Sequence, residues 1–119
     1  MQPTEKHNQK IARLTFAEVY PHYLKKVESK GRSQAELHQI IQWLTGFDEP
    51  QLQQAIDEQL TFEAFFERAQ LNPNASLIKG VICGYRVEEI ENLLTQKVRY
   101  LDKIIDELAK GKSIEKICR

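Results

Sequence analysis

The spacing of apolar residues along the chain predicts a protein built from helices. The clearest apolar stripe consists of Leu37, Ile40, Ile41 and Leu44. Intervals of three and four residues place such side chains on one face of a helix. The stripe follows Ser33–Glu36, which has the form of a capping box, and it stops at Gly46, a natural helix terminator. We therefore expect a helix between Ser33 and Gly46.

An earlier helix is predicted by the same kinds of signal. Thr15–Glu18 has the form of a second capping box, and Gly31 is the natural stop. The apolar positions between these signals are Phe16, Val19, Tyr20, Tyr23, Leu24 and Val27. Pro21 falls inside the stripe, and its ring lacks an N–H and clashes with the preceding turn. We expect the helix to kink or restart at Pro21.

Two shorter helices are expected next along the chain. Asp48–Pro50 resembles a helix start with an acidic cap and a proline in the first turn, and Thr61 can cap a further helix. The inner faces of these two helices are Leu52, Ile56 and Leu60 in the first, and Phe62, Phe65, Phe66 and Ala69 in the second. Asn72–Asn74 then predicts a turn, in which Asn74 can cap the segment that follows.

The segment Ser76–Cys83 admits two interpretations. Its apolar pairs at 77–78 and 81–82 recur at an interval of four, which favours a buried helix. Its β-branched residues and Gly80 are compatible with a strand. We prefer the helix because no partner strand is visible elsewhere in the sequence, and we expect Gly84 to end it.

The longest predicted helix runs from about Arg86 to Lys110. Its apolar stripe is Val87, Ile90, Leu94, Leu101, Ile105 and Leu108. Glutamates occupy its first turns and lysines its end, an order that suits the helix dipole. Gly111 is expected to stop this helix, and Ser113 to cap a short final one.

These elements predict an all-α fold. We expect a compact single domain of about five or six helices, with the long C-terminal helix packed across the shorter ones. Residues 1–10 are polar and are predicted to form a flexible N-terminal tail, which leaves residues 11–119 as the helical domain. A chain of 119 residues is long enough to build one hydrophobic core without a disulfide or a metal.

Charge and composition narrow the classes of partner. The 17 basic and 17 acidic residues give a formal net charge of zero, whereas nucleic-acid-binding proteins usually carry a basic surplus. No apolar run is long enough to span a bilayer, and the first ten residues lack the apolar segment of a signal peptide. We expect a cytoplasmic protein with no membrane association, and we disfavour nucleic acid as its partner.

Several blocks of sequence together resemble a known family. The blocks are Phe16-x-x-Val-Tyr-Pro21, Lys30-Gly-Arg32, Trp43-Leu-Thr-Gly46, Phe65-Phe66, Leu71-Asn-Pro-Asn74, Gly80-Val-Ile-Cys-Gly84, Arg86-Val-Glu-Glu-Ile90 and Leu101-Asp-Lys-x-Ile-Asp-Glu-Leu-Ala-Lys-Gly111. Their order is similar to that of the bacterial domain-of-unknown-function family 2200, from about Ile11 onward. The resemblance implies a small bacterial cytosolic protein, and it brings no activity, cofactor or catalytic residue with it.

The sequence contains no motif that commits to a cofactor. Gly111-Lys-Ser113 resembles the end of a phosphate-binding loop, but Asp106 stands where that motif needs a glycine. The three histidines, His7, His22 and His38, do not lie at metal-ligand spacing from one another or from a cysteine. We expect no cofactor and no metal, and we assign no catalytic residue.

Cys83 has two interpretations. It lies in an apolar stretch, so we favour a buried structural cysteine over a reactive thiol. The reactive alternative rests on the helix predicted to begin at Arg86, since a helix N-terminus stabilises a nearby thiolate.

Polar residues gather around the apolar segment at 76–83, and they form the candidate ligand site. The residues that we assign to it are Asn72, Asn74, Lys79, Tyr85, Arg86 and Glu89. The predicted start of the long helix offers free N–H groups to an anion, and Arg86 adds a guanidinium. Helix caps, a helix start and Arg–Glu pairs account for the same residues structurally.

Three classes of function remain open. The sequence favours a non-catalytic binding or regulatory module, with a homodimer through the long helix as one arrangement. The alternative is an enzyme or a small-ligand (anion) binder that uses the region Asn72–Glu89. A nucleic-acid-binding module comes third, on the basic stretch Lys25–Arg32, which Glu28 interrupts.

Overall fold

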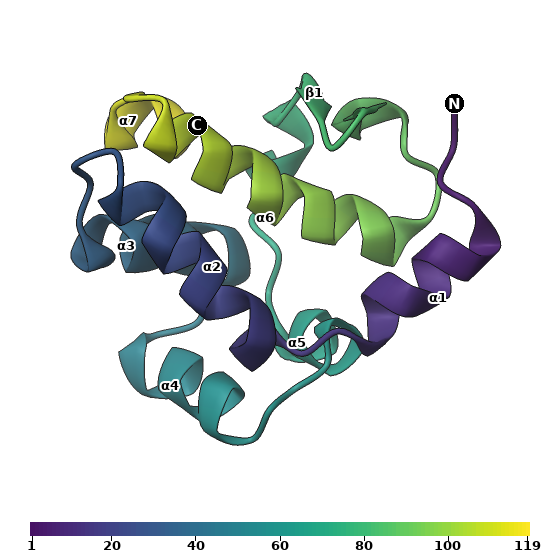
Figure 1. The fold of residues 1–119 in the computed structure, drawn as a ribbon, viewed down its shortest axis with the longest axis horizontal. Coiled ribbons are helices and arrows are strands. Elements are labelled where there is room, and N and C mark those ends of the chain that lie inside the picture. The colour runs from purple at the N-terminus through teal and green to yellow at the C-terminus, as the bar shows by residue number, and fades with distance from the viewer.

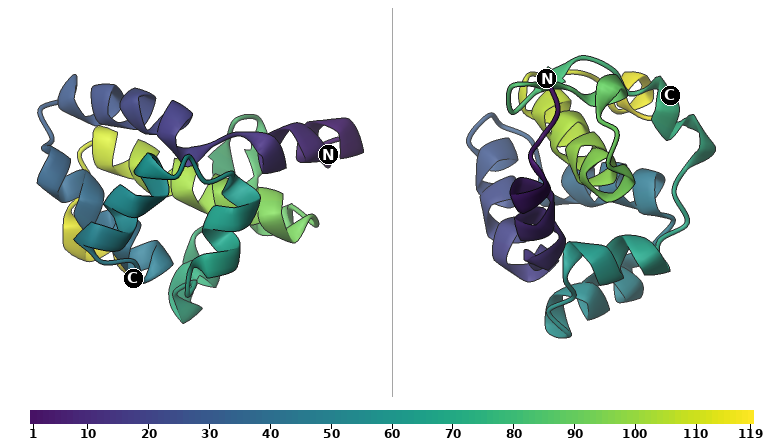
Figure 2. Two further views of the ribbon diagram at one scale, coloured as in Figure 1. Left: turned by 90° about the horizontal axis from the view of Figure 1, so that it is seen from below. Right: turned by 90° about the vertical axis from the view of Figure 1, so that its right-hand side faces the viewer.

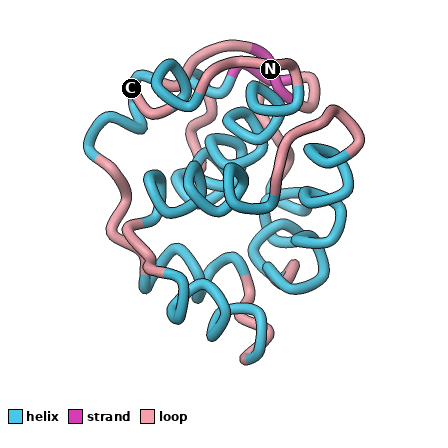
Figure 3. The backbone as a smooth tube through the Cα atoms, turned by 90° about the vertical axis from the view of Figure 1, so that its left-hand side faces the viewer, coloured by secondary structure: helices cyan, strands magenta, loops and turns pink.

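A computed structural model, which describes residues 1–119, shows helices arranged around one central helix (Figure 1). That central helix is α6 (Leu93–Ala109). The other α-helices are α1 (Glu5–Arg13), α2 (Phe16–Glu28), α3 (Gln34–Thr45), α4 (Glu49–Asp57), α5 (Phe62–Arg68) and α7 (Ile114–Ile117). The remaining elements are the 3₁₀ turns η1 (Pro73–Leu77) and η2 (Val87–Glu89) and the strands β1 (Val81–Ile82) and β2 (Tyr85–Arg86). The all-α prediction with a long C-terminal helix is confirmed, and Figure 3 shows the strands confined to one short hairpin.

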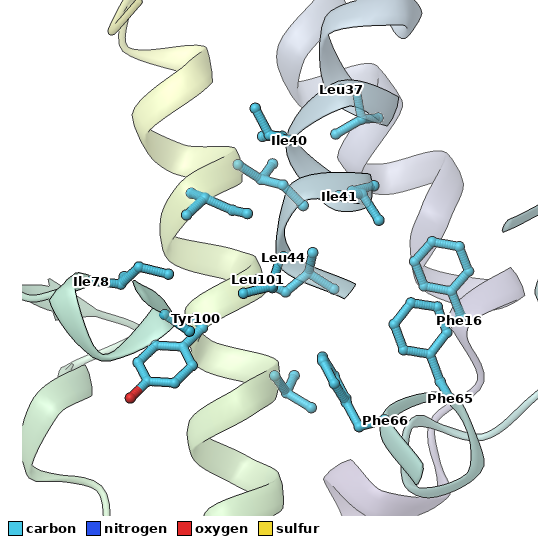
Figure 4. Packing of buried hydrophobic residues seen from close by; sticks show 14 of the residues in the cluster. Phe16, Leu37, Ile40, Ile41, Leu44, Phe65, Phe66, Ile78, Tyr100 and Leu101 are labelled. Atoms are coloured by element: carbon cyan, nitrogen blue, oxygen red, sulfur yellow. The ribbon is translucent and has the colours of Figure 1, made fainter. Parts of the chain in front are cut away.

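The core forms where α6 meets its neighbours. α6 packs against α1, α2, α3, α5 and α7. Figure 4 shows Leu101 of α6 beside Leu44 of α3, with the rings of Phe65 and Phe66 nearby. Four apolar residues of α6 are at most 1% exposed: Leu101, Ile104, Ile105 and Leu108. Because each such side chain contributes about 1.5–3 kcal/mol on burial, this one helix face supplies much of the driving force for folding.

Local capping signals fix most helix boundaries as predicted. Ser33 and Glu36 form a reciprocal capping box, and Asp48 forms another with Gln51. The hydroxyls of Thr61 and Ser113 accept hydrogen bonds from backbone N–H groups in the first turns of α5 and α7. A cap of this kind contributes about 1 kcal/mol.

Helix α1 (Glu5–Arg13) overlaps residues 1–10, the segment that the sequence assigns to a flexible tail. The side chain of Thr4 caps it by accepting from the backbone N–H of His7, and Ile11 is only 4% exposed. The hydroxyl of Thr95 in α6 donates to Oδ1 of Asn8 at 2.6 Å. A helix this short is marginal alone, so its contacts with α6 account for a helix that no local apolar stripe predicts.

Helix α2 is one continuous element and does not restart at Pro21. The helix runs from Phe16 to Glu28 with the proline inside it. Phe16 and Val27, which lie near its two ends, are fully buried. Burial at both ends offsets the hydrogen bond that the proline removes.

The preference for a helix over Ser76–Cys83 is wrong. The chain forms a 3₁₀ turn up to Leu77 and then a two-stranded hairpin, in which Val81 pairs with Arg86. Cys83 and Gly84 have φ angles of 51° and 83°. Two central residues with positive φ make the type I′ turn that joins adjacent strands, so the partner strand lies only two residues away.

The long helix begins at Leu93, seven residues after the predicted start at Arg86. Oδ1 of Asn92 caps it by accepting from the N–H of Thr95 at 2.9 Å. The glutamates at 88, 89 and 91 therefore precede the helix and do not occupy its first turn. Val87 and Ile90 are buried separately, and this anchors the preceding segment outside the helix.

No helix of the structure combines the length and the apolar character needed to cross a membrane.

Candidate functional site

A groove runs along α6 where α1, α2 and the hairpin meet it. Its first part is a cavity of about 350 Å³, and its apolar walls are Ile11, Leu14, Val19, Tyr23, Phe62 and Val98. The polar residues of this part are His7, Lys10, His22, Arg99 and Asp102. An adjoining cavity of about 250 Å³ shares His22, Tyr23 and Asp102 and extends to Lys26, Ile82, Cys83 and Ile105. We call these two cavities together the α6 groove.

The connection between α1 and α2 shapes this groove. The backbone N–H of Phe16 donates to the carbonyl of Leu60 at 2.9 Å, and that of Phe62 donates to the carbonyl of Leu14 at 2.8 Å. These two bonds tie the connection to the start of α5. The right-hand view of Figure 2 shows α1 and α2 following one another beside α6. Side chains of all three helices line the groove.

Arg99 connects three elements at the floor of the groove. Its Nη1 donates to Oδ2 of Asp102 at 2.7 Å and contacts Sγ of Cys83 at 3.3 Å. Its Nη2 lies 3.1 Å from Nε2 of His7. A guanidinium has no acceptor, so the imidazole nitrogen of His7 accepts this bond. Arg99 thereby brings together α1, α6 and the hairpin.

Asp102 is held by Tyr23 as well as by Arg99. The Tyr23 hydroxyl donates to Oδ1 of Asp102 at 2.7 Å, so each oxygen of the carboxylate has a partner. Burial raises the pKa of Tyr23 well above its usual value, and the negative charge of Asp102 raises it further. Tyr23 therefore stays protonated near neutral pH and acts as a hydrogen-bond donor. Asp102 and Arg99 are 15% and 13% exposed, so this network is largely shielded from water.

Arg99 also has unused hydrogen-bonding capacity. Its Nε is the one buried side-chain nitrogen or oxygen of the protein without a hydrogen-bond partner. A guanidinium carries five N–H groups, and Asp102, Cys83 and His7 engage three of them. A buried donor without a partner costs about 1–3 kcal/mol. Nε is itself buried, so an acceptor supplied by a ligand would recover that cost only after a covering side chain moves aside.

The 350 Å³ cavity carries an excess of positive charge. Two of its lining side chains are cationic, Lys10 and Arg99, and one is anionic, Asp102. With neutral histidines the lining therefore has one net positive charge. In the adjoining cavity, Lys26 is engaged outside the groove by Asp106, with Nζ and Oδ1 3.1 Å apart.

A larger depression of about 710 Å³ lies on the outer side of α1. Its lining residues all fall within the segment 4–14, and only one of them is hydrophobic. Because a single segment provides the whole lining, the depression has no opposing wall that could enclose a ligand. The smaller α6 groove, which five elements line (α1, α2, α5, α6 and the hairpin), is the stronger candidate site.

The structure does not gather the six sequence-predicted site residues into one cavity. Asn72 caps η1 and donates through Nδ2 to the carbonyl of Trp43, while Asn74 donates to the carbonyl of Arg119. Lys79 and Glu89 are exposed.

The other two predicted residues lie on the hairpin. Tyr85 is half-buried, with its ring 6.4 Å from that of His7, and exposed Arg86 lies 3.7 Å from Glu88. None of the six predicted residues lines the α6 groove or the depression on α1.

The interpretation of Cys83 as a buried structural residue is wrong. Cys83 is exposed, because it occupies the tip of the hairpin instead of a buried helix. The reactive alternative also loses its predicted basis, since no α-helix begins at Arg86. The cationic neighbour of the thiol is Arg99, which lies 16 residues away in sequence.

Sequence reasoning missed the residues that line the α6 groove. Arg99 and Asp102 stand three residues apart on one helix, and that spacing alone signals their pairing. No local signal connects them with His7, which is 92 residues from Arg99. The polar character of residues 1–10 conceals the fact that His7 and Lys10 belong to a packed helix.

A second polar network lies away from the groove. Nε2 of His38 is hydrogen-bonded to the Tyr20 hydroxyl, and Nδ1 of His38 lies 2.6 Å from Oε1 of Glu49. These three side chains join α2, α3 and α4, and none of them lines the α6 groove or the depression on α1. We interpret this network as a structural link between the three helices. The structure contains no group of three or more His, Cys, Asp or Glu side chains placed to hold a metal ion.

Comparisons with known proteins extend the family resemblance. The model of a family described as an uncharacterised protein conserved in bacteria, DUF2200, matches residues 10–119. A solved structure, titled as the crystal structure of uncharacterized protein SP1917, is similar to this chain at 40% sequence identity and a TM-score of 0.85. The match covers 92% of this chain and 90% of that one. No curated protein matches the chain.

Proposed function

We propose that this chain, which belongs to the DUF2200 family of uncharacterised bacterial proteins, is a binding module for a small organic anion. The anion occupies the α6 groove and is held by Arg99. The unpartnered Nε of Arg99 is the observation that supports this proposal most directly. An anion binder is the alternative function that the sequence analysis gave. We assign its site to the α6 groove instead of the region Asn72–Glu89.

The lining of the groove suits an amphipathic molecule. Its larger cavity has the size at which small-molecule sites begin, about 300 Å³. Apolar side chains such as Phe62 and Val98 form its walls, whereas Lys10 and Arg99 supply positive charge. Ligand sites commonly combine an apolar lining with a few polar groups that fix the orientation of the ligand.

Small size limits the affinity that we expect. Ligands gain between about 0.3 and 1.5 kcal/mol per non-hydrogen atom. At roughly 0.5 kcal/mol per atom, a probe such as hexanoate, with about eight such atoms, reaches roughly 4 kcal/mol, which corresponds to a Kd of about 1 mM. Binding in this range calls for probes at millimolar concentration.

A thermal-shift comparison of matched probes tests the proposal. Hexanoate and hexylphosphonate supply anionic head groups on one apolar tail, and hexanamide supplies the same tail without charge. A ligand at ten times its Kd stabilises the native state by about 1.4 kcal/mol, which raises the Tm by a few degrees. We expect a rise with at least one of the two anions and none with the amide.

Variants locate the binding on Arg99. Arg99→Gln removes the guanidinium and should abolish the rise, and Arg99→Lys keeps the charge without the planar fork and should weaken it. Arg68→Gln is the matched control, because Arg68 is 53% exposed and pairs with Glu58 away from the groove. Far-ultraviolet circular dichroism verifies that each variant is folded. The proposal fails if both anions leave the Tm unchanged, or if Arg99→Gln responds as the unmodified protein does.

A further inference from the structure

We infer that the ligand of the α6 groove is a monocarboxylate with an apolar body, and that its carboxylate replaces His7 on Arg99. This inference rests on the proposed function, because it names the ligand class and the residue that competes with the ligand. Three observations support the inference: the hydrogen-bond partners of Arg99, the net charge of the cavity and the position of His7.

One edge of the Arg99 guanidinium is underused. The N–H groups of Nε and Nη2 lie along this edge, and His7 is their one partner. The other side is occupied, because Nη1 binds Asp102 and contacts Cys83. Asp102 holds the guanidinium in a fixed orientation from that occupied side. An edge with two parallel N–H groups matches the two oxygens of a carboxylate.

The charge of the cavity selects a monoanion. Lys10 and Arg99 together exceed Asp102 by one positive charge. One carboxylate neutralises that excess, whereas a dianionic phosphate monoester would leave an uncompensated negative charge in a largely apolar cavity. Both oxygens of Asp102 are already engaged, by Tyr23 and by Arg99, which limits its repulsion of an incoming carboxylate.

His7 occupies the edge that the carboxylate needs. Its Nε2 accepts from one of the two N–H groups of Nη2 of Arg99; where this is the N–H beside Nε, the ligand displaces the imidazole to engage both Nη2 and Nε. The His7 side chain is only half-buried and belongs to a helix on the rim of the groove, so its imidazole can turn outward without unfolding α1. His7 therefore acts as a built-in competitor of the ligand.

His22 provides a matched control for this role. It lines both cavities of the groove, and its side chain makes no hydrogen bond to another residue. Removal of either imidazole enlarges the groove, but only removal of His7 frees an N–H group of Arg99. A difference in hexanoate affinity between the two variants therefore indicates competition by His7 and not enlargement of the groove.

Isothermal titration of hexanoate at pH 8, where an imidazole is ordinarily neutral, tests the inference. We expect His7→Ala to bind hexanoate about three- to tenfold more tightly than the unmodified protein, and His22→Ala to bind within twofold of it. His7→Gln supplies another acceptor to Arg99 and should stay close to the unmodified protein. Hexylphosphonate, a substantial share of which is dianionic at this pH, should bind more weakly than hexanoate.

An NMR readout follows Arg99 directly. The Nε–H signal of Arg99, assigned by its loss in Arg99→Lys, should shift downfield as hexanoate is added, because Nε gains an acceptor. The same probe should leave the Nε–H signal of Arg68 in place. Circular dichroism of His7→Ala establishes that α1 remains folded.

The possible outcomes separate this inference from the proposed function. Equal or weaker binding of hexanoate by folded His7→Ala overturns the inference, while binding by the unmodified protein still supports the function. Binding of hexylphosphonate in preference to hexanoate also overturns the inference alone. Binding by His7→Ala but not by the unmodified protein overturns the proposed function, and the inference that rests on it falls with it. Absence of binding in both proteins overturns both proposals.

Discussion

Nη2 of Arg119 donates to both carboxylate oxygens of Glu107, at 2.8 and 2.7 Å, and thereby ties the segment after α7 back to α6. The Glu107 side chain is only 10% exposed, so cationic partners must compensate for the burial of its carboxylate. The second partner is Lys112, whose Nζ lies 3.3 Å from Oε2.

Arg119→Ala should destabilise the protein by about 1–3 kcal/mol, because a largely buried carboxylate loses a bidentate partner. Lys112 retains part of the compensation and keeps the loss below that of a fully unpaired charge. Urea denaturation measures the change. Lys112→Ala is the control, and its smaller effect should reflect the longer and more exposed contact. Equal effects of the two variants would contradict a dominant role of Arg119.

Glu36 should make the stability of the protein depend on acidic pH. Hydrogen bonds from Arg32, and then from the backbone N–H of Ser33, lower the pKa of Glu36 from 4.5 to about 2. A lowered pKa stabilises the folded state above the unfolded value, so this contribution is complete above about pH 4.5 and is lost as the pH falls toward 2.

The matching variant is Glu36→Gln. We expect it to cost on the order of 1 kcal/mol at pH 7, after allowance for solvent screening of a partly exposed pair. Urea titrations at pH 7, 5, 3 and 2 should show the difference between the two proteins shrinking only below pH 4.5. A difference that is independent of pH would show that packing and not charge causes the effect.

His38 should couple α2 to α4. It bonds Tyr20 through one ring nitrogen and Glu49 through the other. His38→Ala should cost about 1–2 kcal/mol, because the half-buried Tyr20 hydroxyl loses a partner and α4 loses a tether. Hydrogen exchange should accelerate first in the amides of α4. His22→Ala removes an exposed imidazole and should change the free energy of unfolding by less than about 0.5 kcal/mol.

Cys83→Asn should stabilise the hairpin. Cys83 has a φ of 51°, a conformation that Asn adopts more readily than most residues, and Asn-Gly is the preferred pair in a type I′ turn. We expect a gain of up to about 1 kcal/mol in thermal or urea unfolding. Cys83→Val places a β-branched side chain at the same φ and should destabilise the protein. A loss of stability in both variants would mean that the contact between Arg99 and Sγ outweighs the backbone preference.

Where a signal and its consequence lie within a few residues, sequence reasoning predicted the structure well. The capping box at Ser33, the left-handed Gly46 and the capped start at Asp48 each act on their own helix turn. The family could also be predicted, because its motifs are short and their order is preserved along the chain.

Where two local interpretations were close in energy, the sequence was insufficient. The segment 76–86 has enough apolar residues for a helix, but the positive φ angles at Cys83 and Gly84 and the burial of Ile78 and Val87 favour a hairpin. In α1, only Ile11 is buried, and packing against α6 supplies the stability that the local sequence lacks.

The sequence by itself determined that this protein is helical, where most of its helices begin and end, and which faces of them are apolar. Only the tertiary structure decided that His7 and Arg99, 92 residues apart, meet in one groove beside Asp102. The physical reason is that caps and apolar periodicity act over one or two helix turns. A binding site arises from the packing of distant elements, and no local pattern records that arrangement.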